Sequence, residues 1–183
     1  MLTRTFFVCL FVGLYSAGSS LSCRWMDHKF RQYSENSLAL VETMVSNSTN
    51  STEGEVQDTV AFPNDLYSQA SKASAEDKVV FTVQALDEMA ALFEEDYSSA
   101  SFEEKTVKDF LSVVTQQADG LRSCIESHSH NKKNKKLHMY FKRLSSHVLK
   151  GMRHSAESWE LIRKEIKTHL MRADQLVSSL LTN

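Results

Sequence analysis

The scarcity of turn-forming residues constrains the fold of this chain more than any other feature. After position 22 the chain contains three glycines, Gly54, Gly120 and Gly151, and one proline, Pro63. A β-sandwich or barrel of this size needs many tight turns, which are usually built with glycine and proline. So few turn residues predict a small number of long elements, and we expect an all-α protein.

The first 22 residues have the pattern of a secretory signal peptide. Arg4 supplies a positive charge, Phe6 through Tyr15 form an apolar segment too short to span a membrane, and small residues follow up to Cys23. We expect cleavage of residues 1–22, with cuts after Gly18 or Ser20 as alternatives. The remaining residues 23–183 are expected to form one extracellular domain.

The cysteine content fits a single disulfide. Cys9 lies in the apolar part of the expected signal, which leaves Cys23 and Cys124 in the mature chain. The secretory route favours oxidation, so we expect these two to pair, with two unpaired buried thiols as the alternative. Closing a loop of roughly 100 residues stabilises a protein by up to about 4.7 kcal/mol in the chain-entropy model.

Apolar residues recur at helical spacing in five segments. They lie at residues 24–46, from Ser74, from Ser101 to near 124, from 137 to 150, and from about 156 to 181. The pairs Ser74–Asp77 and Ser101–Glu104 have the spacing of capping boxes, and Gly151 is expected to end the fourth helix. Residues 47–71 form a long connection with at most one helical turn. We therefore expect a five-helix bundle in which this long first crossover allows an up-up-down-down topology.

Motifs for catalysis are absent from the sequence. It contains no G-x-S-x-G, P-loop, H-E-x-x-H or C-x-x-C pattern, so we expect neither enzymatic activity nor a cofactor. His128 and His130 share an expected loop, but zinc sites usually take three or four protein ligands, and we expect no metal. With 21 Lys and Arg against 23 Asp and Glu, no overall basic field indicates binding to nucleic acid or membrane.

Two polar segments carry surface features. Asn47 and Asn50 begin consecutive N-glycosylation sequons, of which at least one is expected to be used in a secreted loop. The segment 128–136 carries four lysines that are either a weak contact for heparan sulfate or a solvated turn, and we favour the turn. These are Lys132, Lys133, Lys135 and Lys136.

A helical wheel divides the last helix into two sides. The buried side is expected to include Trp159, Ile162 and Ile166, with His169 partly buried beside them. The opposite side includes Glu160, Lys164, Lys167 and Met171, and Arg163 lies at the boundary. Glu160 and Lys164 have the spacing of an ordinary ion pair. Flexible thioethers suit partner surfaces, so Met171 is as consistent with binding as with chance.

Five segments of the chain resemble type I interferons, in the same order and over essentially the whole mature sequence. The most specific is SAESWELIRKEIKTHL at 155–170, which is similar to the C-terminal signature of that family. The others are YFKRL at 140–144, the Phe62-Pro63 segment with Leu66-Tyr67, LDEMAALF at 86–93, and FLSVVTQQADGLRSC at 110–124. A Cys-x-Trp start and two cysteines resemble the two-cysteine group of bony-fish interferons.

The resemblance implies a monomeric, secreted antiviral cytokine with no chemistry of its own. Such a protein joins two different class II cytokine receptor chains, whose Janus kinases phosphorylate each other and STAT proteins. Candidate receptor contacts are Phe62 in the long connection and Arg163, Lys164, Lys167 and Met171 in the last helix. The alternatives are a helical cytokine of another branch with different receptors and a secreted helical lipid carrier.

Overall fold

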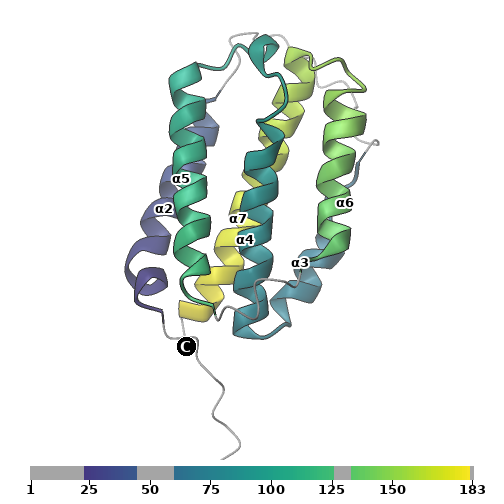
Figure 1. Cartoon of the computed structure of the whole chain (residues 1–183). Helices are drawn as coiled ribbons and strands as arrows, with labels where there is room; N and C mark the ends of the chain where they lie inside the picture. Colours follow the sequence, from purple (N-terminus) through teal and green to yellow (C-terminus); the bar gives the residue numbers. More distant parts are fainter. Residues whose placement is uncertain (1–22, 45–59, 126–132, 182–183) are drawn as a thin grey trace, which may run out of the picture.

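The computed structural model describes residues 23–44, 60–125 and 133–181, and these residues form helices and turns without any strand (Figure 1). The expected signal peptide, both sequons, His128, His130 and Lys132 lie outside the described residues. The long helices are α2 (Arg24–Thr43), α4 (Ala75–Leu92), α5 (Glu104–Arg122), α6 (Lys135–Arg143) and α7 (Ala156–Leu181). The shorter ones are α3 (Asn64–Ser71), the 3-10 turn η1 (Ser98–Ala100) and the π-helix η3 (Leu144–Leu149).

Four helices make the bundle, and their directions follow the expected up-up-down-down order. Helix α2 packs against α5 and α7, and α4 packs against the same two helices. Helices α2 and α4 run in one direction, whereas α5 and α7 run in the other (Figure 1). Helix α6 packs against α4 at the edge of the bundle. The all-α helical-cytokine topology expected from the sequence is therefore confirmed, with α3 as an additional helix in the long first connection.

A disulfide between Cys23 and Cys124 ties the start of α2 to the chain two residues beyond the end of α5, with the two Cα atoms 5.3 Å apart. The neighbouring Trp25 indole lies over Gly120, where an added Cβ would overlap its ring. Gly120 therefore does more than weaken α5, because its missing side chain lets Trp25 cover the helix beside the disulfide.

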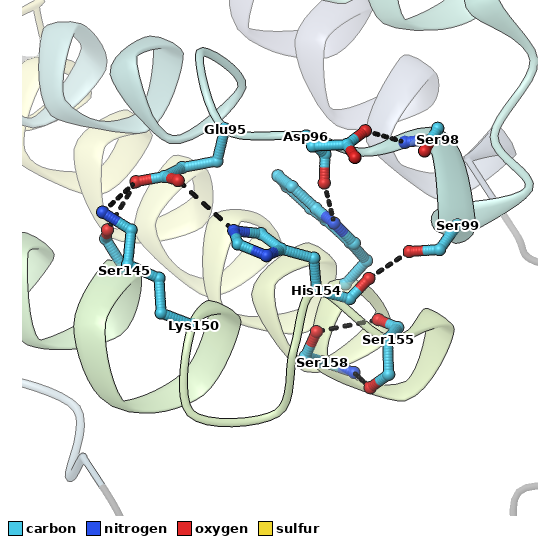
Figure 2. A network of polar contacts seen from close by, with 10 residues as sticks. Glu95, Asp96, Ser98, Ser99, Ser145, Lys150, His154, Ser155 and Ser158 are labelled. Atoms are coloured by element: carbon cyan, nitrogen blue, oxygen red, sulfur yellow. Dashed lines mark hydrogen bonds and ion pairs between the residues drawn. The ribbon is translucent and has the colours of Figure 1, made fainter.

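A network of polar contacts closes the opposite end of the bundle (Figure 2). Glu95, after α4, accepts hydrogen bonds from Ser145 at 2.8 Å and Lys150 at 3.0 Å, and its other oxygen lies 3.3 Å from His154 Nε2. The Lys150 ammonium is the main cause of the lowered pKa of Glu95. The indole of buried Trp159 donates to the Asp96 carbonyl at 3.0 Å. These contacts hold the α4–α5 connection against the turn that enters α7.

The expected N-cap at Ser74 is present, and the one expected at Ser101 is absent. The Ser74 hydroxyl accepts from the Asp77 backbone N–H at 3.1 Å, as the sequence predicts. At the start of α5, however, Glu103 is the N-cap and its side chain makes no capping hydrogen bond. The prediction for Ser101 is wrong because this residue adopts a left-handed conformation, with φ of 56°, to end η1 and turn the chain toward α5.

The expectation that Gly151 ends the fourth helix is also wrong, because other residues make the turn. The left-handed residues at this turn are Arg153 and His154, both with φ of 54°, while Gly151 has no positive φ. The helix widens into η3, and the turn follows two residues after the glycine. Gly151 is instead a point of close approach, since a Cβ there would overlap the carbonyl oxygen of His147.

Candidate interaction surface

The signature in the first half of α7 divides between core and surface. Trp159, Ile162 and Ile166 are fully buried, in keeping with the face that their spacing predicts. Trp159 stacks on Phe93, with ring centroids 5.5 Å apart. These residues position α7, so any contact with a partner has to come from the outward side of the helix.

Arg163 is held firmly at the junction of α7 and α2. Its guanidinium donates to both carboxylate oxygens of Glu160, at 2.8 and 2.6 Å, and to the Val41 carbonyl in the last turn of α2 at 3.2 Å. Only 13% of its side chain is exposed. The Glu160 carboxylate is the main cause of its raised pKa. The expected Glu160–Lys164 pair is wrong, because the forked guanidinium takes both oxygens of Glu160.

A second ion pair joins the same two helices. Lys167 Nζ lies 2.8 Å from a carboxylate oxygen of Glu42 on α2. This hydrogen bond from Lys167 is the main reason that the pKa of Glu42 is lowered. About two turns further along α7, Ser34 donates to Asp174 at 2.7 Å. The polar side of α7 therefore borders α2 along its length.

The outward row of α7 consists of Lys164, Lys167 and Met171. Their spacing of three and four residues places them on one side of the helix. Lys164 is exposed and makes no ion pair within the described part of the chain, and Met171 is 47% exposed. A flexible thioether beside two ammonium groups is a surface that can adapt to a partner. We call these three residues the outward row.

Phe62 points inward and serves to dock α3. Its ring is half-buried and lies 4.7 Å from His169 of α7 and 5.5 Å from Tyr67 of α3, in a stacked arrangement with the latter. The structure thus separates Phe62 from the outward row, although the sequence places all of them among the candidate contacts.

His169 lies at the centre of an aromatic cluster and is fully buried, so the expectation of partial burial is wrong. Its Nδ1 lies 2.7 Å from the Tyr67 hydroxyl, and the Phe141 ring is 4.8 Å away. Nε2 has no hydrogen-bond partner among the described residues. Burial lowers the pKa of His169 to about 3, which keeps the ring neutral at physiological pH.

Neither a metal centre nor a membrane span is found in the described ranges. No group of three or more His, Cys, Asp and Glu side chains in them could hold a metal ion. None of their helices is long and apolar enough to cross a membrane.

The α2 residues in this surface have no signal of their own in the sequence. Val41 contributes a backbone carbonyl, and Glu42 is one acidic residue among many. Their position opposite α7 follows from the crossing of the two helices, which periodicity alone does not specify.

Three comparisons with known proteins all identify interferons as similar to this chain. Residues 26–180 match the model of the interferon alpha/beta domain. Interferon a3 of Oncorhynchus mykiss is 34% identical over 181 residues, covering 98% of this chain and 99% of that protein. Among solved structures, zebrafish interferon 1 superposes with a TM-score of 0.73 and 29% identity, over 86% of this chain and 99% of the other.

Proposed function

Because this chain belongs to the interferon alpha/beta family and is a type I interferon cytokine, we propose that it is secreted and acts by joining two different class II cytokine receptor chains. Residues 1–22 direct export, and the domain 23–183 is the active form. The ligand performs no chemistry. It lowers the cost of bringing two receptor chains together, because the second chain binds from within the same membrane.

The downstream step in this proposal is phosphorylation. Janus kinases carried by the two receptor chains phosphorylate each other and STAT proteins, and antiviral genes are induced. The family match gives this reading precedence over another cytokine branch or a lipid carrier. Asn47 and Asn50 are proposed glycan sites.

The outward row of α7 supports a first receptor contact. Lys164, Lys167 and Met171 combine two cations with an exposed, adaptable apolar side chain on a helix whose other side is fixed in the core. Arg163 contributes to this contact mainly by positioning, since its guanidinium is committed to Glu160 and Val41. The second receptor chain then binds on the opposite side, over α4, α5 and the side of α6 next to α4, clear of the exposed lysines and arginine of α6.

The test measures binding to each receptor chain separately, together with signalling. In cells of the source species the protein is expected to induce STAT phosphorylation and virus resistance. The double substitution Lys164→Glu and Met171→Ala is expected to weaken binding to one receptor chain at least tenfold. Binding to the other chain should not change.

A matched control is Lys105→Glu, at an exposed lysine on α5 that is paired with Asp109. It should leave the first receptor chain unaffected. Signalling by the α7 double variant at wild-type dose would contradict the contact. Absence of STAT phosphorylation with the wild-type protein, beside an active interferon, would contradict the function itself.

A further inference from the structure

Positive charge is concentrated in one part of the chain. Residues 127–156 hold eight lysines and arginines and no aspartate or glutamate. Of the 21 basic residues in the sequence, 13 remain elsewhere, against all 23 acidic residues. The small net charge of the whole chain therefore results from a basic segment of 30 residues and an acidic remainder. Around the basic segment the electrostatic potential is expected to be positive.

Helix α6 presents this charge to solvent. Four of its basic side chains are exposed, and none of them forms an ion pair within the described residues. They are Lys135, Lys136, Lys142 and Arg143, which we call the basic face. The acidic groups nearby are engaged elsewhere: Glu88 faces His138 at 2.9 Å, and Glu95 binds Lys150.

The spacing within α6 aligns the cations in two rows. Lys135 and Lys142 are seven residues apart, as are Lys136 and Arg143. Seven residues are nearly two turns and span about 10 Å, so the members of each pair lie along the same line of the helix. Helix α6 is at the edge of the bundle away from α2 and α5 (Figure 1), which leaves both rows accessible.

The composition of this face favours a polyanion over a protein as its ligand. Met139, 47% exposed, is its one large exposed apolar side chain. A stable protein interface buries about 800 Å² on each partner around an apolar or aromatic core, in which lysine is depleted. The basic face has two rows of unpaired cations and no apolar core of this kind. It is therefore complementary in charge and spacing to a linear polymer with repeated negative charges.

We propose that the basic face of α6 binds a linear sulfated polysaccharide of the heparan sulfate type. The sequence alone favours a solvated turn for Lys132, Lys133, Lys135 and Lys136 over a weak contact with heparan sulfate. In the structure, however, Lys135 and Lys136 belong to α6, where the fold aligns them with Lys142 and Arg143. The proposal rests on the proposed secretion, but not on the receptor contacts of α7. Binding would hold the protein near the cell surface, and the acidic remainder would disfavour other orientations.

Heparin-affinity binding of the purified secreted protein, residues 23–183, at physiological salt tests the proposal. Wild type is expected to be retained, and its affinity should fall steeply with added salt, as expected when condensed counterions are released. A variant with all four residues of the basic face changed to Gln should bind at least tenfold more weakly. Gln has nearly the helix propensity of Lys and Arg, so α6 should persist, which circular dichroism checks.

A control variant removes the same charge from another surface. It carries Gln at four exposed basic positions of α2 and α5, namely Lys29, Arg31, Lys105 and Lys108. This variant should retain most of its heparin affinity. Equal losses in both variants would show attraction by net charge alone and would overturn the site. Elution of the wild type below physiological salt would also overturn it.

The same variants separate this site from receptor binding. On cells that lack heparan sulfate, the basic-face variant should induce STAT phosphorylation at the wild-type dose. A loss of signalling on those cells would assign the basic face to a receptor and contradict the proposal. On cells that carry heparan sulfate, the variant should be washed from the surface more readily than the wild type.

Discussion

At the scale of single residues, Arg163 shows how a signature residue can act through the fold. Its side chain binds Glu160 and the Val41 carbonyl, so the Arg163→Ala variant leaves a largely buried carboxylate unpaired. We expect the free energy of unfolding to fall by about 2 kcal/mol, within the range for hydrogen bonds to charged groups. Arg163→Lys should restore only part of it, because an ammonium cannot form the forked contact. Urea unfolding measures both changes, and an unchanged midpoint in Arg163→Ala would contradict this role.

His169 predicts a specific dependence of stability on pH. Its pKa is about 3 in the folded protein and about 6.5 in the unfolded chain, so between these values the unfolded chain binds more protons. Stability should therefore decrease as the pH falls from about 6.5 toward 3, with a loss of about 2 kcal/mol at pH 5. The contribution of His169 is measured by comparing the free energy of unfolding at pH 7 and pH 5 in the wild type and in His169→Gln. The loss of stability between the two pH values should be smaller in the variant. Equal losses would show that His169 does not cause the decrease.

The effect of Gly120→Ala on stability is expected to change sign with the residue at position 25. In an exposed helix, Gly to Ala stabilises by about 1 kcal/mol, but here the added Cβ would overlap the Trp25 indole. We expect Gly120→Ala to lower the melting temperature. In a Trp25→Ala background the same change should raise it, because the overlap is gone. A double-mutant cycle measured by thermal unfolding tests this, and the same sign in both backgrounds would be the contrary result.

At the scale of elements, the spacing of apolar residues correctly predicts the long helices that bury one side. Helix α7 runs from Ala156 to Leu181, as its apolar spacing indicates, and α4 begins behind the Ser74 cap. Both signals are local, since side-chain spacing and a capping hydroxyl lie within a few residues of each other. They need no knowledge of the partner helices.

The elements that differ from expectation depend on distant contacts. Helix α3 is longer than one turn because Tyr67 reaches His169 on α7. The π-helix η3 closes with a hydrogen bond from the Lys150 N–H to the Ser145 carbonyl, while their side chains both bind Glu95. Nothing in residues 144–150 alone indicates this widening.

The docking of α3 through Phe62 can be tested as a property of that helix. Phe62→Ala removes the ring that packs against both Tyr67 and His169, so α3 should open more readily from the bundle. We expect amide hydrogen exchange of residues 64–71 to accelerate by at least tenfold, with little change in α5. Lys164→Ala serves as the control and should leave α3 protected. Acceleration spread evenly over all helices would instead indicate global destabilisation.

At the scale of the whole molecule, the candidate surface was predictable only in part. The sequence separates the buried side of α7 from its outward side, since both follow from one helix. It does not place Glu42 beside Lys167, because that pair depends on the crossing of α2 and α7. Similarly, the sequence does not show that the four cations of α6 lie on one exposed surface, because this depends on which side of α6 packs against the bundle.

The disulfide is expected to stabilise the bundle and, through it, activity. The bond closes a loop with a sequence separation of 101 residues, for which the chain-entropy model gives about 4.7 kcal/mol. Cys124→Ser should therefore lower the midpoint of chemical unfolding substantially, and signalling should fall with the folded fraction. Reduction of the wild type provides a second measurement. Full signalling by Cys124→Ser at a temperature where it is partly unfolded would contradict this coupling.

The same bond divides the chain into a covalent ring and a tail. Residues 23 to 124, with α2, α3, α4 and α5, lie inside the ring, whereas α6 and α7 lie outside it. One protease cut within the ring opens it but releases no fragment, so a ligand nicked there keeps its mass until it is reduced. One cut after Cys124, in contrast, can separate α7 from the rest. The resistance of this cytokine to proteolysis should therefore depend on where it is cleaved as much as on how often.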